Sequence, residues 1–280
     1  MSRTVLALTD LTARSDAALA WADSVAAACG WSLHVAHAVE LADRELARTG
    51  DDLHRVHHAI VTADAAARAQ LQRTLGERAA LTERVIDLDG AWPAMQRRAA
   101  VLQPALMVLP RVVLSADDAF DSALSKDHAL AQIRCDVLLV DDSAPSDARH
   151  MVAILHQVTL DARTIQCAGR WSHILKHAIA SSSIASTPAL ELVLLADDGS
   201  LPTALQEPAP DLVIIPGTLL SRDEPDGSML WSLRKMLRET SAPVLVLRGE
   251  PQVQPGLTGL LARLERQRTG AAVEHLPLMA

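Results

Sequence analysis

Three histidines that lie close together in the sequence have the spacing that metal chemistry would need. Asp51, His54 and either His57 or His58 recur at intervals of three and four residues, so a helix would carry them on one face. Imidazole nitrogens in that arrangement can bind zinc. The stretch lacks the His-Glu-x-x-His pattern, and such spacing without a fuller motif is common on helices. We therefore predict no metal site, with His54, His57 and His58 as the only candidates for one.

Covalent and redox chemistry have no matching motif. Serine and histidine are plentiful, but the chain has no Gly-x-Ser-x-Gly sequence of the kind that presents a nucleophilic serine. Cys29, Cys135 and Cys167 are far apart and form no Cys-x-x-Cys pair, which argues against a zinc knuckle or a redox pair. We expect three buried structural thiols, and we predict no catalytic residue.

The composition limits the partners. The chain has 26 basic and 34 acidic residues, a net charge of −8, and no basic cluster. Such a chain is a poor partner for nucleic acid or an anionic membrane. Residues 1–10 do not resemble a signal peptide, and no apolar run reaches the roughly 18 residues that a membrane helix needs. We expect a cytoplasmic protein.

The sequence repeats itself. An Asp-Gly turn with a following proline, an aliphatic run ending in proline, and a second aliphatic run recur in the same order with similar spacing. Such a repeat indicates two copies of one unit. The three pairs are residues 89–93 with 198–202, 104–110 with 210–216, and 137–140 with 244–247.

Strands and helices alternate along the first copy, which predicts parallel βαβ units. Ser15 is expected to cap the first helix and Gly30 to end it. Pro93 is expected in the first turn of a short helix, where its missing N–H costs nothing. The predicted strands are 4–9, 32–39, 83–88, 105–109 and 137–140, and the other predicted helices are 41–75 and 124–133.

The second copy is shorter. Its predicted elements are a strand at 150–156, a helix at 164–180, a strand at 190–196 and the two repeated aliphatic runs. From Thr4 to Gly90 is 86 residues, whereas from His150 to Gly199 is 49. The difference of 37 residues matches one strand and one long helix. We therefore expect the second copy to lack its second strand and second helix.

These boundaries predict three parts. Residues 1–145 form the first unit, 146–250 the truncated second unit, and 251–280 a tail. Leucines in the tail at i, i+3, i+4 and i+7 predict an amphipathic helix, which packs on its own chain or docks on another subunit. They are Leu257, Leu260, Leu261 and Leu264.

Both copies resemble the universal stress protein family. Residues 4–10, ending in Asp10, and the following 15–22 are similar to the family's opening, and 242–247 resembles its last strand. The resemblance covers roughly 3–143 and 150–249. It implies a doubly wound parallel sheet of order 3-2-1-4-5 in each copy, with ligand at the carboxyl ends of strands one and four.

The resemblance also implies where ATP would bind. Binding members carry Gly-x-x-Gly, nine residues and Gly-Ser/Thr after strand four, because glycines let main-chain N–H groups approach phosphate. The first copy has Pro-Arg-Val-Val-Leu at 110–114 instead, followed by Asp117, Asp118 and Asp121. Asp10 stands at the position that touches the base in binding members. Without the loop, Asp10 can serve only to cap its turn, so we expect ATP binding to be lost here.

The second copy keeps more of this loop. Gly217 and Thr218 follow strand four, and Gly227 and Ser228 open the next helix. Leu220 replaces the middle glycine, and the spacing between the outer glycines is ten residues against thirteen in the family pattern. Two interpretations remain open: a degenerate loop with Ser228 as a plain helix cap, or a residual nucleotide site.

The overall prediction is a cytoplasmic tandem universal stress protein that acts as a non-catalytic binding or regulatory module without a required cofactor. The alternative is an ATP-binding sensor or weak ATPase that uses the residual glycine loop of the second copy. Expected partners are the other lobe or a second copy in a homodimer, and a protein bound through the C-terminal helix. Nucleic acid and membrane are not expected.

Overall fold

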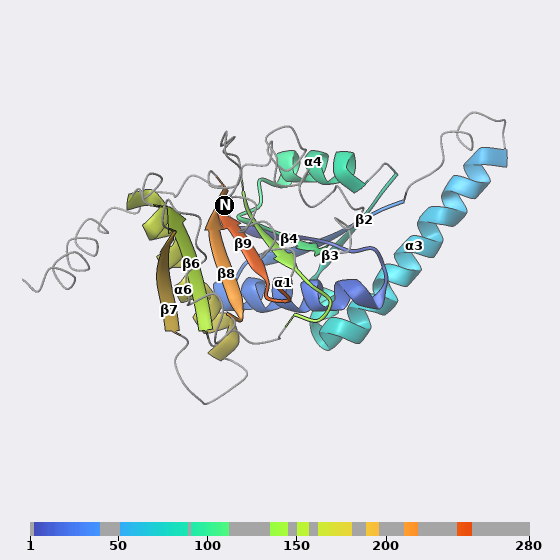
Figure 1. Ribbon diagram of the computed structural model, residues 1–280. Helices are drawn as coiled ribbons and strands as arrows, with labels where there is room; N and C mark the ends of the chain where they lie inside the picture. Colours follow the sequence, from blue (N-terminus) through green and yellow to red (C-terminus); the bar gives the residue numbers. More distant parts are fainter. Residues whose placement is uncertain are drawn as a thin grey trace, which may run out of the picture.

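The structure is a computed structural model in which the strands of both halves form one sheet (Figure 1). Aliphatic runs become strands because a parallel sheet covered on both faces buries them from both sides. The sheet has nine strands, in the order β3-β2-β1-β4-β5-β9-β8-β6-β7. The residues described are 3–39, 51–88, 91–111, 135–144, 150–156, 162–180, 189–195, 210–217 and 240–247.

The first half confirms the predicted strand order 3-2-1-4-5. Its neighbouring strands are all parallel, and β1 lies between β2 and β4. The chain therefore winds outward from β1 in both directions, which is the doubly wound arrangement. The strands are β1 (Thr4–Leu8), β2 (Ser32–Ala38), β3 (Glu83–Asp87), β4 (Leu106–Pro110) and β5 (Asp136–Val140).

The second half repeats the pattern with one strand fewer. β6 lies between β7 and β8, and β8 pairs with β9, all in parallel. β7 therefore takes the place beside β6 that β2 takes beside β1, and among the described residues no strand lies beyond it. That the second copy lacks its second strand and second helix remains a prediction. The strands are β6 (His150–His156), β7 (Ala189–Leu195), β8 (Leu212–Pro216) and β9 (Val244–Leu247).

The two halves meet where β5 pairs with β9, which we call the β5–β9 junction. This pairing is antiparallel, with Leu138 opposite Leu245. The two halves therefore run in opposite directions within one sheet. The residue bounds given above for two separate domains remain a prediction.

Helices cover both faces of the sheet (Figure 1). α4 lies on one face, over β1 and β2, while α1 lies on the other and packs against α3 and α6. No described helix is long and apolar enough to cross a membrane. The helices are α1 (Asp16–Cys29), α3 (Asp51–Leu75), α4 (Ala91–Leu102) and α6 (Ala162–Ala180), with short 3-10 helices η1 (Ala13–Ser15) and η2 (Gly76–Leu81).

The ends of α1 show how local sequence sets the helix bounds. Gly30 ends the helix in a left-handed conformation (φ 63°) and donates its N–H to the carbonyls of Ala26 and Ala27. Side chains other than glycine tolerate this backbone conformation poorly. Ser15 occupies the N-cap position but makes no capping hydrogen bond. Ser15 is therefore the N-cap residue, as predicted, but its hydroxyl binds Asp10 instead of a main-chain N–H of the helix.

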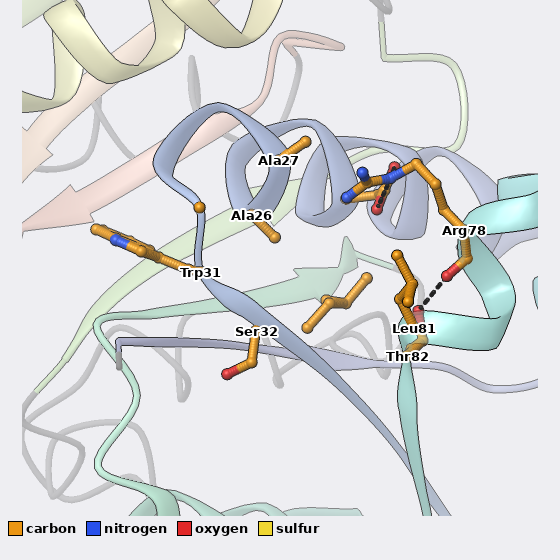
Figure 2. Close-up of a pocket in the computed structure, with 10 residues that line it drawn as sticks. Ala26, Ala27, Trp31, Ser32, Arg78, Leu81 and Thr82 are labelled. Atoms are coloured by element: carbon orange, nitrogen blue, oxygen red, sulfur yellow. Dashed lines mark hydrogen bonds and ion pairs between the residues drawn. The ribbon is translucent and has the colours of Figure 1, made fainter. Parts of the chain in front are cut away.

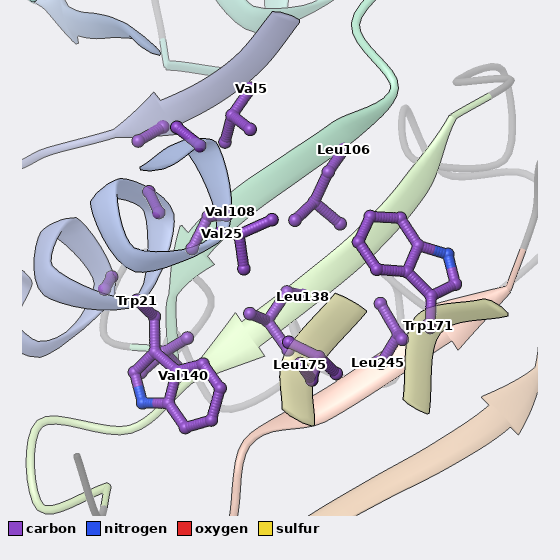
Figure 3. Close-up of a cluster of buried hydrophobic side chains, with 14 of the residues drawn as sticks. Val5, Trp21, Val25, Leu106, Val108, Leu138, Val140, Trp171, Leu175 and Leu245 are labelled. Atoms are coloured by element: carbon purple, nitrogen blue, oxygen red, sulfur yellow. The ribbon is translucent and has the colours of Figure 1, made fainter. Parts of the chain in front are cut away.

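One hydrophobic core runs through both halves (Figure 3). It includes Val25 of α1, Leu138 of β5, Trp171 and Leu175 of α6, and Leu245 of β9. Trp171 is completely buried. Because residues of both halves fill the same core, the halves stabilise each other.

Several predicted elements lie outside the described residues. These are the part of the second helix before Asp51, the helix at 124–133 and the C-terminal tail.

Candidate functional site

The strand order predicts one ligand crevice in each half, at the carboxyl ends of the strands. Strand order reverses between β1 and β4 in the first half and between β6 and β8 in the second. In doubly wound sheets the loops diverge at such points and leave a crevice. The residues that follow β1, β4, β6 and β8 are therefore the candidate site residues.

Asp10 follows β1 and is occupied by its own loop. Its carboxylate accepts hydrogen bonds from Ser15 Oγ (2.5 Å), Thr12 Oγ1 (2.8 Å) and the Thr12 main-chain N–H (2.9 Å). Burial raises the pKa of Asp10, but these hydrogen bonds outweigh it and hold the pKa below its usual value. Asp10 is thus an ionised group that closes a turn.

The loop after β1 is also fixed by α3. Thr9 Oγ1 donates to Gln70 Oε1 (2.6 Å), and Gln70 Nε2 donates to the Thr12 carbonyl (2.7 Å) and to Asp16 (2.9 Å). Gln70 is buried. Leu11 has a positive φ of 63°, a strained conformation for leucine. The network therefore holds this loop in a shape that the backbone alone would not favour.

Arg111 follows β4, where a phosphate loop would begin. Its guanidinium donates to the main-chain carbonyls of Thr240 (2.5 Å) and Ala242 (3.0 Å), just before β9. Burial lowers the pKa of Arg111, and the charge of Asp141 opposes that shift. Arginine stays charged in proteins. The cation at the first crevice is therefore used to hold the second half of the chain.

Asp141 stands after β5 much as Asp10 stands after β1. It accepts hydrogen bonds from the Ser143 hydroxyl (2.6 Å) and the Ser143 N–H (3.1 Å). Burial raises its pKa, but the bonds from Ser143 and the charge of Arg111 leave it below the usual value. The first half thus has two ionised carboxylates at its carboxyl edge, each bound to a nearby hydroxyl.

The second crevice is described only in part. His156 is the last residue of β6, and Gly217 follows β8 directly. These two positions flank the reversal point of the second half. The other predicted site residues, Thr218, Gly227 and Ser228, lie outside the described residues.

The histidine group on α3 does not come together as a site. His54, His57 and His58 are all exposed, and His58 contacts Thr62 of the next turn. Among the described residues, no group of three or more histidine, cysteine or acidic side chains could hold a metal ion.

The prediction of three buried thiols is confirmed for two of the cysteines. Cys135 and Cys167 are buried and Cys29 is half-buried. Burial raises the pKa of the Cys29 thiol above its usual value, so the thiol stays protonated and weakly reactive.

A pocket of about 220 Å³ lies near the amino end of β2, whereas the two crevices lie at the carboxyl ends of strands (Figure 2). It is formed by the end of α1, the start of β2, η2, and Thr82, which directly precedes β3. Trp31 and Leu81 line it, and Arg78 crosses its rim to bind Asp23 at 2.7 Å. Pockets for small molecules usually span about 300–1,000 Å³, so this one fits no more than a small group.

Sequence patterns missed three of the residues that shape the first crevice. Gln70 could have been noticed, because it is a polar residue on the face of α3 that also carries the buried Ala63 and Ala67. Asp141 follows an aliphatic run, as Asp10 does. In the sequence, Arg111 stood out only as part of the segment that replaces the glycine loop. Its partners lie about 130 residues away, so no local pattern indicates them.

The fold is that of universal stress proteins. A solved universal stress protein from Archaeoglobus fulgidus DSM 4304 superposes with a TM-score of 0.58 at 9% identity, over 90% of this chain and 98% of its own. A candidate universal stress protein from Pseudomonas aeruginosa UCBPP-PA14 gives 0.54 at 15% identity, over 96% and 98%. No protein-family model and no curated protein sequence matches the chain. The resemblance noted in the sequence is thus confirmed for the fold.

Proposed function

We propose that this chain is a universal stress protein that acts in the cytoplasm as a non-catalytic binding or regulatory module, with ATP binding lost from its first half. The observation that carries the proposal is the contact of Arg111 with Thr240 and Ala242. A phosphate loop after β4 needs main-chain N–H groups open to an anion. Here the only cation described at that position binds carbonyls of the second half instead.

The state of Asp10 supports the same proposal. A base-contacting carboxylate needs a free acceptor oxygen for the ligand. In this chain, Oδ1 of Asp10 accepts hydrogen bonds from Ser15 and from the hydroxyl and main-chain N–H of Thr12, and Oδ2 shares the Thr12 hydroxyl. A nucleotide base would therefore compete with the bonds that close the turn after β1.

A second candidate function is nucleotide binding in the second half. Gly217 directly follows β8, next to the reversal point. A glycine there would let the main chain approach a phosphate. Together with Thr218, Gly227 and Ser228, it could form a shortened phosphate loop for a stress sensor or a weak ATPase.

Thermal unfolding with and without millimolar MgATP separates the two functions. A ligand at 100 times its Kd adds about 2.7 kcal/mol of stability to the folded state. The binding module without ATP predicts an unchanged melting temperature. A rise that Gly227→Val abolishes would support the second candidate, and a rise that survives Gly227→Val but is lost in Asp10→Ala would contradict the proposal.

A further inference from the structure

The two outer strands of the sheet differ in charge. β3 forms one edge and carries three charged residues in five positions. Two of them make ion pairs, Arg84 with Asp64 at 3.4 Å and Asp87 with Arg97 at 2.8 Å, and Glu83 lies 3.3 Å from the His34 ring. Charged side chains along an edge strand oppose pairing with another chain. The β3 edge is therefore protected.

The β7 edge lacks this protection. β7 has the sequence Ala-Leu-Glu-Leu-Val-Leu-Leu, with Glu191 as its one charged residue and no proline. It ends the sheet on the side opposite β3 (Figure 1). Among the described residues, β7 pairs only with β6. An edge of this composition favours the addition of a strand.

The place beyond β7 is one that the fold fills in the first half. There, β3 pairs with β2 on the side away from β1. In the second half, the equivalent position outside β7 has no described strand. In the part of the chain that the structure describes, the apolar strand β7 therefore ends the sheet.

The sequence of β7 is complementary to itself. If two copies pair antiparallel about a twofold axis at Leu192, Leu190 lies opposite Leu194 and Glu191 lies opposite Val193. Ala189 then lies opposite Leu195. In this register no like charges are opposed, and Leu190 of each copy is paired with Leu194 of the other. Directly opposed apolar pairs stabilise antiparallel strands, and a twofold interface needs such self-complementarity.

We propose that the β7 strands of two copies of this chain pair antiparallel, centred on Leu192, to form a homodimer with one continuous sheet. The chain already joins its own halves by antiparallel edge pairing at the β5–β9 junction. In that junction β9 pairs with the edge of β5 that lies away from β4, so β5 cannot pair with a strand of a second copy. The β7 dimer does not depend on whether either half binds ATP.

Cross-linking tests the position of the axis. Leu192→Cys places two thiols opposite each other, and paired residues in antiparallel strands are close enough for a disulfide. Under mild oxidation we expect a covalent dimer of Leu192→Cys, but not of the unsubstituted chain or of Val85→Cys on the β3 edge. A Leu192→Cys protein that stays monomeric, or a Val85→Cys protein that cross-links equally well, would overturn the proposal.

Charge substitutions test the register without relying on a new cysteine. In Val193→Glu, the new carboxylate lies opposite Glu191 of the other copy, and the twofold axis repeats this pair of like charges. Because opposed like charges destabilise paired strands, we expect the dimer dissociation constant to rise at least about threefold. Adding Glu191→Lys makes both pairs attractive and should restore the dimer. Light scattering during gel filtration gives the oligomeric state. A monomeric unsubstituted chain at about 100 µM, or a dimer that Val193→Glu leaves unchanged, would contradict the proposal.

Discussion

The indole nitrogen of Trp171 donates a hydrogen bond of 2.6 Å to the buried carboxylate of Asp136. Trp171 belongs to α6 of the second half, and Asp136 begins β5 of the first. Arg111 makes the corresponding contact at the other end of β5, with Thr240 and Ala242. The β5–β9 junction is therefore held by polar contacts at both ends, with the shared apolar core between them.

Loss of the Trp171 donor should destabilise the whole chain. Trp171→Phe keeps an aromatic ring in the core but removes one hydrogen bond to Asp136. A hydrogen bond to a charged group contributes about 1.5–3 kcal/mol, so we expect the free energy of unfolding in urea to fall by about that amount. Trp31→Phe is the control, because Trp31 packs edge-on against Trp171 and is only partly buried. Equal losses in the two variants would mean that the hydrogen bond contributes little.

Arg111 should control local opening at β9. Arg111→Met removes both bonds to the carbonyls before β9, and Arg111→Lys keeps the charge without the paired geometry. We expect hydrogen exchange in β9 to be faster in both variants, and fastest in Arg111→Met. Arg14→Met, at an exposed arginine, should leave exchange in β9 unchanged. Unchanged exchange in Arg111→Met would show that the core alone holds the junction.

Acid should weaken the fold through Asp10 and Asp141. Both have a pKa lowered by folding, because hydrogen bonds to the carboxylate outweigh burial. Their stabilising effect is therefore present above the unfolded pKa and is lost as pH falls through the folded pKa. In the unfolded chain the pKa of each carboxyl lies near that of a free aspartate side chain. We therefore expect the free energy of unfolding to decline below about pH 5.

Neutral variants identify the groups that cause this decline. Asp10→Asn and Asp141→Asn should each be less stable than the unsubstituted chain at pH 7 and less sensitive to acid. Glu77→Gln, at an exposed position, is the control and should keep the original pH dependence. If Asp10→Asn and Glu77→Gln show the same dependence, Asp10 does not carry the effect.

Two glycines should respond in opposite ways to alanine. Gly30 has φ +63° with nothing within 4 Å of an added Cβ, so Gly30→Ala destabilises the protein only through the backbone conformation. We expect the free energy of unfolding to fall by roughly 1–2 kcal/mol. Gly169 lies within α6, also with open space around it, so Gly169→Ala should stabilise the protein by about 0.5–1 kcal/mol. Chemical denaturation measures both. Equal shifts of the same sign would contradict the structure of these segments.

Much of the fold follows from the sequence because parallel strands leave a local signal. The strand predicted at 150–156 matches β6 residue for residue, and the repeated aliphatic runs are β4, β5, β8 and β9. The shorter spacing in the second copy agrees with the four strands described there, against five in the first half. A fully buried strand must be aliphatic along its length, so composition alone reveals it.

The contacts that join the two halves could not be predicted in this way. Arg111 with Thr240, and Trp171 with Asp136, join residues far apart in the chain, and neither pair belongs to a short motif. They arise from the antiparallel pairing of β5 with β9, which depends on the packing of both halves. Ser15 shows the same effect locally, because a hydroxyl that could cap α1 binds Asp10 instead.

Equilibrium dialysis with labelled MgATP tests the central claim most directly. The unsubstituted chain, Asp10→Ala and Gly217→Val would be compared at protein concentrations above about 50 µM, where weak binding in the millimolar range is measurable. We predict that Asp10 makes no contribution to saturable binding. Any binding of MgATP should therefore be equal in the unsubstituted chain and in Asp10→Ala. Such binding would belong to the second half, and Gly217→Val should abolish it. Saturable binding that falls at least tenfold in Asp10→Ala, and is unchanged in Gly217→Val, would show that the first half still holds ATP.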